Sequence, residues 1–180
     1  MKLKVLLEGK PFMTEYGIVG YSTVVFIACD DGKNILYDCG SKGCVLQLKE
    51  ALEKAGMKPE DITHVAISHL HFDHVGNLPL FSNAQILLSE TEWESANQTP
   101  DEWHSIQTLA YLEKRGNLHF VKEKDMIAED VSVMELPGHT PGLIGLRCGA
   151  ESILCSDAMK NRYELWLSLI HISEPTRRSY

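Results

Sequence analysis

The heptapeptide Ser68-His69-Leu70-His71-Phe72-Asp73-His74 decides how this 180-residue chain is interpreted. It directly follows the apolar run Val65-Ala66-Ile67, which predicts a short buried strand with the histidines at its C-terminal end. His69 and His71 alternate with Leu70 and can point the same way. Asp73 and His74 turn away from that pair and can serve a second ion. Because imidazole and carboxylate groups are ligands for zinc, iron and manganese, the stretch predicts a metal site for more than one ion.

Two other places supply candidate ligands. The loop Leu136-Pro137-Gly138-His139-Thr140-Pro141-Gly142 follows a predicted strand, and its proline and glycine residues favour a tight turn that aims His139 inward. Asp157 lies at the end of the predicted strand 152–156, where an aspartate can also serve as an N-cap. Taken singly, a loop histidine and a strand-end aspartate are ordinary features of a protein surface.

Strand and helix patterns surround these segments. Period-two and β-branched stretches predict strands over residues 3–8, 22–29, 35–38, 65–68, 85–88, 118–121, 131–136, 143–147 and 152–155. A helical period predicts a helix from Cys44 to Ala55 with Gly56 as its C-cap, and Ser89 with Glu92 forms a candidate capping box for another. This order predicts sheets covered by helices rather than a regularly alternating parallel sheet.

A third helix is predicted to begin at Thr99, with Pro100 in its first position, and to end at Gly116. In such a helix Trp103 and Ile106 share one face. Trp103 is therefore expected to pack in the core rather than to line a pocket.

Together these segments resemble the metallo-β-lactamase-fold hydrolases from about residue 3 to residue 166, and most closely the lactonase and glyoxalase II-like branches. The family motif H-x-H-x-D-H is met by residues 69–74, its later histidine by His139 and its bridging aspartate by Asp157. An early Asp-x-Gly is met by Asp38 and Gly40. The resemblance implies an α+β fold: a four-layer αββα sandwich with a metal site at one edge, the last elements being missing.

The resemblance also implies roles for the site residues. His69, His71 and His139 would hold one divalent ion, Asp73 and His74 a second, and Asp157 would bridge the two. Asp38 would orient the ligands through hydrogen bonds. Asp73 would also be catalytic, because it would orient the nucleophile and shuttle its proton. The implied cofactors are two divalent metal ions, zinc first, with iron or manganese as alternatives.

The implied activity is hydrolysis of a small ester, thioester or lactone by a metal-bound hydroxide, with a small-molecule substrate as the partner. Two alternatives stay open. The chain can be a metal-binding fragment without activity, because the family's last ligand is missing. It can also be an iron-dependent oxidoreductase of the same fold.

The composition argues against two classes of binding partner, nucleic acids and membranes. Lys plus Arg is 17 and Asp plus Glu is 25, so the net charge is −8, and without basic clusters no nucleic acid is expected as a partner. No apolar run approaches the ~20 residues of a membrane span, so no membrane is expected either. The five cysteines lack the spacing of a disulfide framework, which is typical of reduced thiols in the cytoplasm. The sequence leaves the oligomeric state open.

The end of the chain does not fit the rest. The segment Leu167-Ser168-Leu169-Ile170-His171-Ile172-Ser173-Glu174-Pro175-Thr176-Arg177 resembles the conceptual translation of a transposase sequencing adapter. We therefore expect a domain over residues 1–166, incomplete at its C-terminus, and a non-native tail over residues 167–180. His171 is the only histidine after Asp157, and we do not expect it to be a metal ligand.

Overall fold

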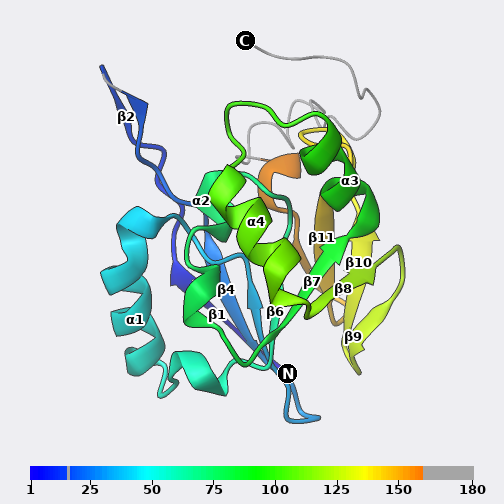
Figure 1. Cartoon of the computed structure of the whole chain (residues 1–180). Coiled ribbons are helices and arrows are strands. Elements are labelled where there is room, and N and C mark those ends of the chain that lie inside the picture. Colours follow the sequence, from blue (N-terminus) through cyan, green and yellow to red (C-terminus); the bar gives the residue numbers. More distant parts are fainter. Residues whose placement is uncertain (16, 160–180) are drawn as a thin grey trace.

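Two β-sheets packed face to face form the centre of the molecule in a computed structural model that describes residues 1–15 and 17–159 (Figure 1). The larger sheet has six strands in the order β1 (Lys2–Leu7), β4 (Val24–Ala28), β5 (Asn34–Tyr37), β6 (His64–Ala66), β7 (Gln85–Ser89) and β8 (Leu118–Val121). Strands β1, β4 and β5 pair antiparallel, whereas β5 to β8 pair parallel. The sheet is therefore mixed and not a regularly alternating parallel sheet, which agrees with the sequence-based expectation.

The second sheet is antiparallel, in the order β12 (Ser152–Leu154), β11 (Ile144–Cys148), β10 (Val131–Glu135) and β9 (Met126–Ala128). Strand β9 was not expected from the sequence. A separate hairpin of β2 (Met13–Thr14) and β3 (Gly17–Ile18) extends from the body of the molecule beside α1 (Figure 1).

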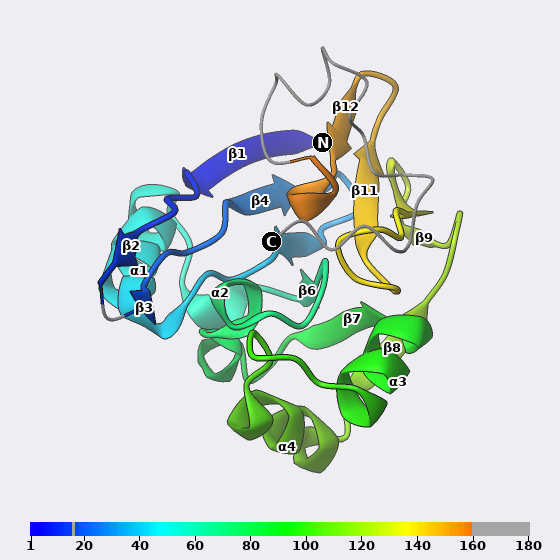
Figure 2. The ribbon, with the colours of Figure 1, turned by 90° about the horizontal axis from the view of Figure 1, so that it is seen from above.

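Helices cover the outer face of the larger sheet: α1 (Val45–Lys54), α3 (Glu90–Gln98) and α4 (Ile106–Arg115). In Figure 2, α1 and α4 lie on one side of that sheet, while β11 and β12 lie on the other. The short helix α2 (Phe72–Val75) lies within the predicted metal-binding stretch, and single 3₁₀ turns span Lys42–Cys44, Pro59–Asp61, Leu78–Leu80 and Ser156–Ala158. Residues 1–159 thus contain three of the four predicted layers.

Strand β4 explains why the layers stack. Successive side chains of a strand point to opposite faces, so Val24 and Phe26 join the core under the helices, whereas Val25 and Ile27 join the core between the sheets. All four are buried. A strand that is apolar on both faces needs a layer on each side, and the predicted sandwich is confirmed in that respect.

Helix ends follow the predicted signals at Gly56, at Ser89 and at Gly116, which follows α4 with φ +72°. After α1, Gly56 has φ +75°, the left-handed conformation that glycine adopts without strain. At α3, the Ser89 hydroxyl accepts a hydrogen bond from the Glu92 backbone N–H at 3.0 Å. The capping box is only half formed, because the Glu92 side chain bonds elsewhere.

The expected start of the third helix is wrong. Residues 99–105 form a loop, and α4 begins after Ser105, whose hydroxyl accepts a hydrogen bond from Thr108 N at 3.3 Å. Ile106 is 78% exposed, and Leu109 and Leu112 form the buried face instead. The physical reason is that Ser105 also offers an N-cap, and that the Phe72 N–H donates to the Trp103 carbonyl at 2.9 Å, which holds residue 103 in the loop.

None of the helices within residues 1–15 and 17–159 is long and apolar enough to cross a membrane.

Candidate metal centre

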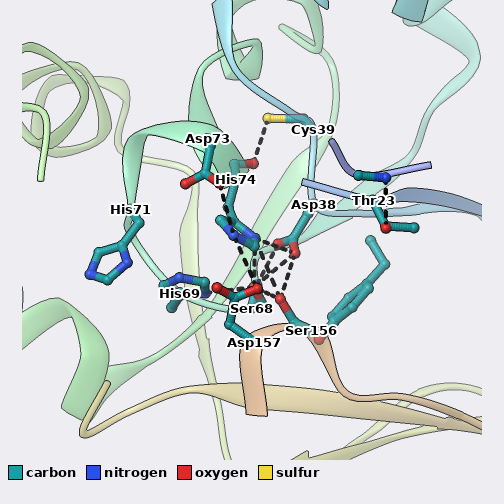
Figure 3. A network of polar contacts seen from close by, with 12 residues as sticks. Thr23, Asp38, Cys39, Ser68, His69, His71, Asp73, His74, Ser156 and Asp157 are labelled. Atoms are coloured by element: carbon teal, nitrogen blue, oxygen red, sulfur yellow. Dashed lines mark hydrogen bonds and ion pairs between the residues drawn. The ribbon is translucent and has the colours of Figure 1, made fainter. Parts of the chain in front are cut away.

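The candidate centre lies where parallel strands β5 and β6 end. Asp38 follows β5 and Ser68 follows β6, so the two residues meet at one edge of the larger sheet. The Asp38 carboxylate accepts hydrogen bonds from the backbone N–H of Ser68 at 2.7 Å and from its hydroxyl at 2.8 Å. The chain then turns from Ser68 into the histidine-rich stretch, and Figure 3 shows Asp38, His69 and His74 gathered there.

Three imidazoles converge from two loops. The ring centroids of His69 and His71 are 4.5 Å apart, and His139 lies 4.9 Å from each of them. His139 Nε2 approaches His71 Nδ1 to 3.1 Å. Ligand atoms of the three residues fall within 4.8 Å of one another, which is close enough for one ion to contact them all.

A second group of donors lies beside the first. His74 Nε2 is 3.7 Å from an oxygen of Asp73 and 3.7 Å from an oxygen of Asp157. The other oxygen of Asp157 is 3.4 Å from His139 Nε2. Asp157 therefore contacts both groups of donors, the placement that a bridging ligand needs. The structure brings together all of the expected ligands.

One buried atom tests whether these residues suit a metal. His69 is completely buried, its Nδ1 lies 3.0 Å from the Ser68 hydroxyl, and its Nε2 has no hydrogen-bond partner among the described residues. A buried polar atom without a partner is costly, and a cation at Nε2 would satisfy it. Three imidazoles with neighbouring carboxylates are a donor set that zinc accepts.

Burial and charge act differently on the histidines. Burial, and then the neighbouring imidazoles, hold the pKa of His69 well below its usual value. Burial likewise lowers the pKa of His71 to about 3. Burial also disfavours charge on His74, but the Asp38 carboxylate, with Asp73 and Asp157, outweighs it and raises the pKa of His74 to about 9. Burial raises the pKa of Asp73 against the opposing effect of His74.

Asp38 fixes the orientation of His74. One Asp38 oxygen lies 2.8 Å from His74 Nδ1, which turns Nε2 toward Asp73 and Asp157. The Ser156 hydroxyl donates to the same oxygen at 3.2 Å and so ties the loop of Asp157 to Asp38 (Figure 3). Asp38 has φ +57° and Ser156 has φ +47°, conformations that non-glycine residues rarely adopt. Such strain is commonly stored at functional sites.

The loop 99–105 adds two polar residues that sequence reasoning missed. Asp101 Oδ2 lies 3.5 Å from His71 Nε2, and the other oxygen of Asp101 lies 2.8 Å from His104 Nδ1. The His71 and His104 rings are 5.1 Å apart. These residues match no motif, and the helix predicted for their segment concealed their approach to His71.

A cavity of about 530 Å³ opens over the candidate centre. Its wall includes Asp73, His74 and Asp157 together with the aromatic residues Tyr21, Phe72 and Trp103. Trp103 stacks on Phe72 with ring centroids 6.2 Å apart. The expectation that Trp103 packs in the core is therefore wrong, because the loop that replaces the expected helix start carries it to the cavity.

Comparisons with known proteins agree with this geometry. Residues 17–169 match the family model described as the Metallo-beta-lactamase superfamily. An N-acyl homoserine lactonase from Bacillus cereus is 35% identical over 91 residues, which cover 51% of this chain and 34% of that protein. The matched part of the chain thus spans about a third of the length of this curated relative.

Two solved structures show the likeness of fold. A protein from Thermotoga maritima, provisionally described as a metallo-beta-lactamase, superposes with a TM-score of 0.76 at 23% identity, covering 96% of this chain and 86% of its own. AidC, described as a dizinc quorum-quenching lactonase in complex with its product, superposes with a TM-score of 0.61 at 21% identity, covering 79% of this chain and 58% of its own.

Proposed function

The chain belongs to the metallo-beta-lactamase superfamily, and from this premise we propose that it is a metal-dependent hydrolase of a small carboxyl ester, with a lactone as its first substrate to test. One observation carries the proposal. His69, whose buried Nε2 has no hydrogen-bond partner among the described residues, belongs to two groups of possible metal ligands, one with His71 and His139 and one with His74 and Asp157. The choice of a lactone rests on the names of curated relatives, which are N-acyl homoserine lactonases.

We assign His69 Nε2, His71 Nδ1 and His139 Nε2 to one divalent ion and His74 Nε2 with Asp73 to a second, with Asp157 shared between them. Zinc is the first candidate, since AidC is described as dizinc and the donors suit that ion. When bound, two such cations would supply a water-derived nucleophile at neutral pH and polarise the carbonyl oxygen of a substrate.

The chain's own residues prepare this chemistry. His69 and His71 stay neutral because their pKa values are low, so each keeps a lone pair without having to lose a proton. Asp38 holds Nδ1 of His74 and so presents Nε2 to the centre. The Asp73 carboxylate, whose pKa is raised by burial, is assigned to accept and return the proton of the reaction.

The cavity supports a small substrate with an apolar part. Phe72 and Trp103 form a stacked aromatic wall next to Asp73, and Tyr21 adds a third ring. An acyl group would bury apolar surface against these rings, while the reacting carbonyl would lie near the donors at the base of the cavity. The net charge of −8 disfavours an anionic polymer as the substrate.

The test is hydrolysis by the zinc-loaded protein of an N-acyl homoserine lactone, a thioester and a simple aryl ester. We expect ring opening of the lactone, loss of activity on chelation, and recovery when zinc is restored. His69→Ala should abolish turnover and zinc binding, whereas replacing the exposed His119 by alanine should change neither. Full zinc occupancy without hydrolysis of any of these substrates would contradict the proposed substrate class.

A further inference from the structure

Glu92 is a buried carboxylate that contacts both histidine-bearing loops. It lies in the first turn of α3 and is 1% exposed. Its Oε1 accepts a hydrogen bond from the backbone N–H of Leu70 at 3.0 Å. Its Oε2 accepts one from the Thr140 hydroxyl at 2.6 Å and one from the backbone N–H of Gly142 at 3.2 Å. One side chain thus joins two loops that lie far apart in the sequence.

The bonded positions are next to candidate ligands. Leu70 separates His69 from His71, and Thr140 directly follows His139. None of the three bonds involves an imidazole: Glu92 contacts the backbone at residues 70 and 142 and the Thr140 hydroxyl, which flank the ring-bearing residues. Glu92 therefore connects the segment that carries His69 and His71 with the segment that carries His139.

The second loop packs closely on α3 around this carboxylate. A Cβ atom added at Gly142 would lie only 2.1 Å from Glu92 N and 2.6 Å from Ser89 Oγ, so only glycine fits there. The Ser89 hydroxyl donates a hydrogen bond to the Gly142 carbonyl at 2.6 Å. The N-terminus of α3 and the loop of His139 therefore have one fixed arrangement, within which Glu92 reaches across to Leu70.

We propose that Glu92 is a positioning residue of the candidate metal centre, which fixes the distance between the two histidine-bearing loops by accepting hydrogen bonds from both with one carboxylate. The inference rests on the proposed assignment of His69, His71 and His139 to a single ion. Three imidazoles contact one ion well only when their separation suits it, and residues that hold ligands in place typically change metal affinity ~10–100-fold when replaced.

The chemistry of the carboxylate makes a sharp test possible. Both Glu92 oxygens accept hydrogen bonds, whereas a glutamine of the same shape has only one acceptor oxygen and an amide nitrogen that donates. In Glu92→Gln, the amide nitrogen must therefore face either the Leu70 N–H or the Thr140 and Gly142 donors. Either way one backbone N–H, that of Leu70 or that of Gly142, loses its acceptor and faces an amide N–H instead, while the volume of the side chain is kept.

The experiment measures zinc affinity of purified wild-type and variant chains by competition with a chromophoric chelator, and records the visible absorption of the cobalt-loaded forms. Glu92→Gln should bind the first zinc ion ~10–100-fold more weakly and show an altered cobalt spectrum. Glu90→Gln is the matched control, because Glu90 is an exposed residue of the same helix turn, and it should match the wild type.

A second pair of variants covers the case in which Glu92→Gln does not fold. Thr140→Val removes one donor at nearly constant volume and should also weaken zinc binding, while Thr140→Ser keeps the hydroxyl and should restore it. Thermal melting of the metal-free proteins shows how much of each variant is folded.

The outcomes separate the two proposals. If the wild-type chain binds no zinc, the proposed metal-dependent function fails. If the wild type binds zinc and folded Glu92→Gln and Thr140→Val bind it equally well, the positioning role of Glu92 is wrong. The role is also wrong if Glu92→Gln only lowers the melting temperature and leaves the affinity and cobalt spectrum of the folded protein unchanged, because Glu92 would then serve stability alone.

Discussion

At the scale of single residues, the candidate centre gives one residue type two different electrostatic states. His69 and His71 are buried among other imidazoles, so neutrality is favoured and their pKa values fall. His74 is equally buried but faces three carboxylates, and its pKa rises to about 9. The sequence His-x-His-x-Asp-His does not distinguish these states, because the carboxylates of Asp38 and Asp157 arrive from other strands.

The first prediction concerns the pH dependence of stability of the metal-free protein. The folded-state pKa of His71, about 3, lies below its unfolded value of about 6.5. The contribution of neutral His71 to the free energy of unfolding is therefore present above pH ~6.5 and is lost as the pH falls. For His74 the folded value of about 9 lies above the unfolded one, so its contribution is present below pH ~6.5 and is lost as pH rises through about 9. Chelator-treated protein should therefore be most stable near neutral pH.

Denaturant unfolding at pH 5, 7 and 9 checks this expectation. In His71→Asn, the free energy of unfolding should fall less between pH 7 and pH 5 than in the wild type. In His74→Asn, it should fall less between pH 7 and pH 9. The exposed His119, replaced by asparagine, serves as the control and should change neither side. An unchanged acid side in His71→Asn would show that this imidazole is not held neutral by burial.

The second prediction concerns Asp73, whose carboxylate lies 3.7 Å from His74 Nε2 and lines the cavity. Asp73→Asn keeps the shape of the side chain but removes the proton acceptor, so turnover of the zinc-loaded protein should fall ~10²–10⁴-fold. Asp130→Asn alters an exposed aspartate away from the cavity and should leave turnover unchanged. Measuring zinc content together with turnover distinguishes loss of the proton acceptor from loss of metal. If Asp73→Asn turned over at the wild-type rate, Asp73 would not be the group that transfers the proton.

Among the secondary-structure elements, the segment between α3 and α4 contains two sequence signals for the start of the same helix. Thr99-Pro100 and Ser105 are both acceptable starts for a helix. The structure uses Ser105, and the freed residues form a loop in which the Asp101 carboxylate accepts a hydrogen bond from Trp103 N at 2.9 Å. That loop is held to the histidine-rich stretch by the bond from Phe72 N to the Trp103 carbonyl at 2.9 Å. A contact distant in sequence therefore decides where α4 begins.

The third prediction tests the face of α4 that packs on the sheet. Leu112 is 2% exposed and belongs to the core under the helices, whereas Ile106 is 78% exposed. Leu112→Ala should lower the free energy of unfolding by ~2–5 kcal/mol, because it removes buried methyl groups and leaves a cavity. Ile106→Ala should change it by no more than ~0.5 kcal/mol. Denaturant unfolding of both variants measures the difference. Equal losses of unfolding free energy would instead support the buried face that was predicted from the sequence and that includes Ile106.

At the scale of the whole molecule, the candidate centre depends on both sheets. The larger sheet supplies Asp38 and the residues after β6, while the loop before β11 supplies His139 and the turn after β12 supplies Asp157. The sheets are held in register at this edge by the bond from Ile144 N to the Ser68 carbonyl at 2.9 Å and by the Tyr37 hydroxyl, which donates to the Ile144 carbonyl at 2.8 Å. Packing of the sandwich and geometry of the centre are therefore coupled.

The fourth prediction concerns residues 167–180, which lie outside the described part of the chain together with His171. We propose that they form a tail beyond the domain of residues 1–166 and contribute no ligand. A chain ending at residue 166 should bind as much zinc per molecule as the full chain, measured by elemental analysis. Loss of a metal ion in His171→Ala would contradict this expectation and assign that histidine to the centre.

What the sequence alone determined is the set of side-chain donors at the candidate centre and the class of fold. Donor types and spacing in residues 68–74 indicated metal ligands, and β-branched or alternating runs indicated most of the strands, because these signals are local and depend on side-chain type and period. The loop of His139 and the strand end at Asp157 were weaker local signals to which the resemblance gave roles, and the resemblance added Asp38. All three residues lie at the candidate centre. Strand β9 and the start of α4 were missed because short elements and element boundaries carry weak local signals.

Only the tertiary structure decided how these groups interact. The charge state of His74 depends on carboxylates from other segments, and Trp103 faces the cavity because a distant backbone bond holds its loop. Glu92 appeared in the sequence as half of a capping box, a local role, but its carboxylate spans two loops instead. These properties depend on distances between segments that are remote in the chain, and such distances are fixed only when the two sheets and the helices pack together.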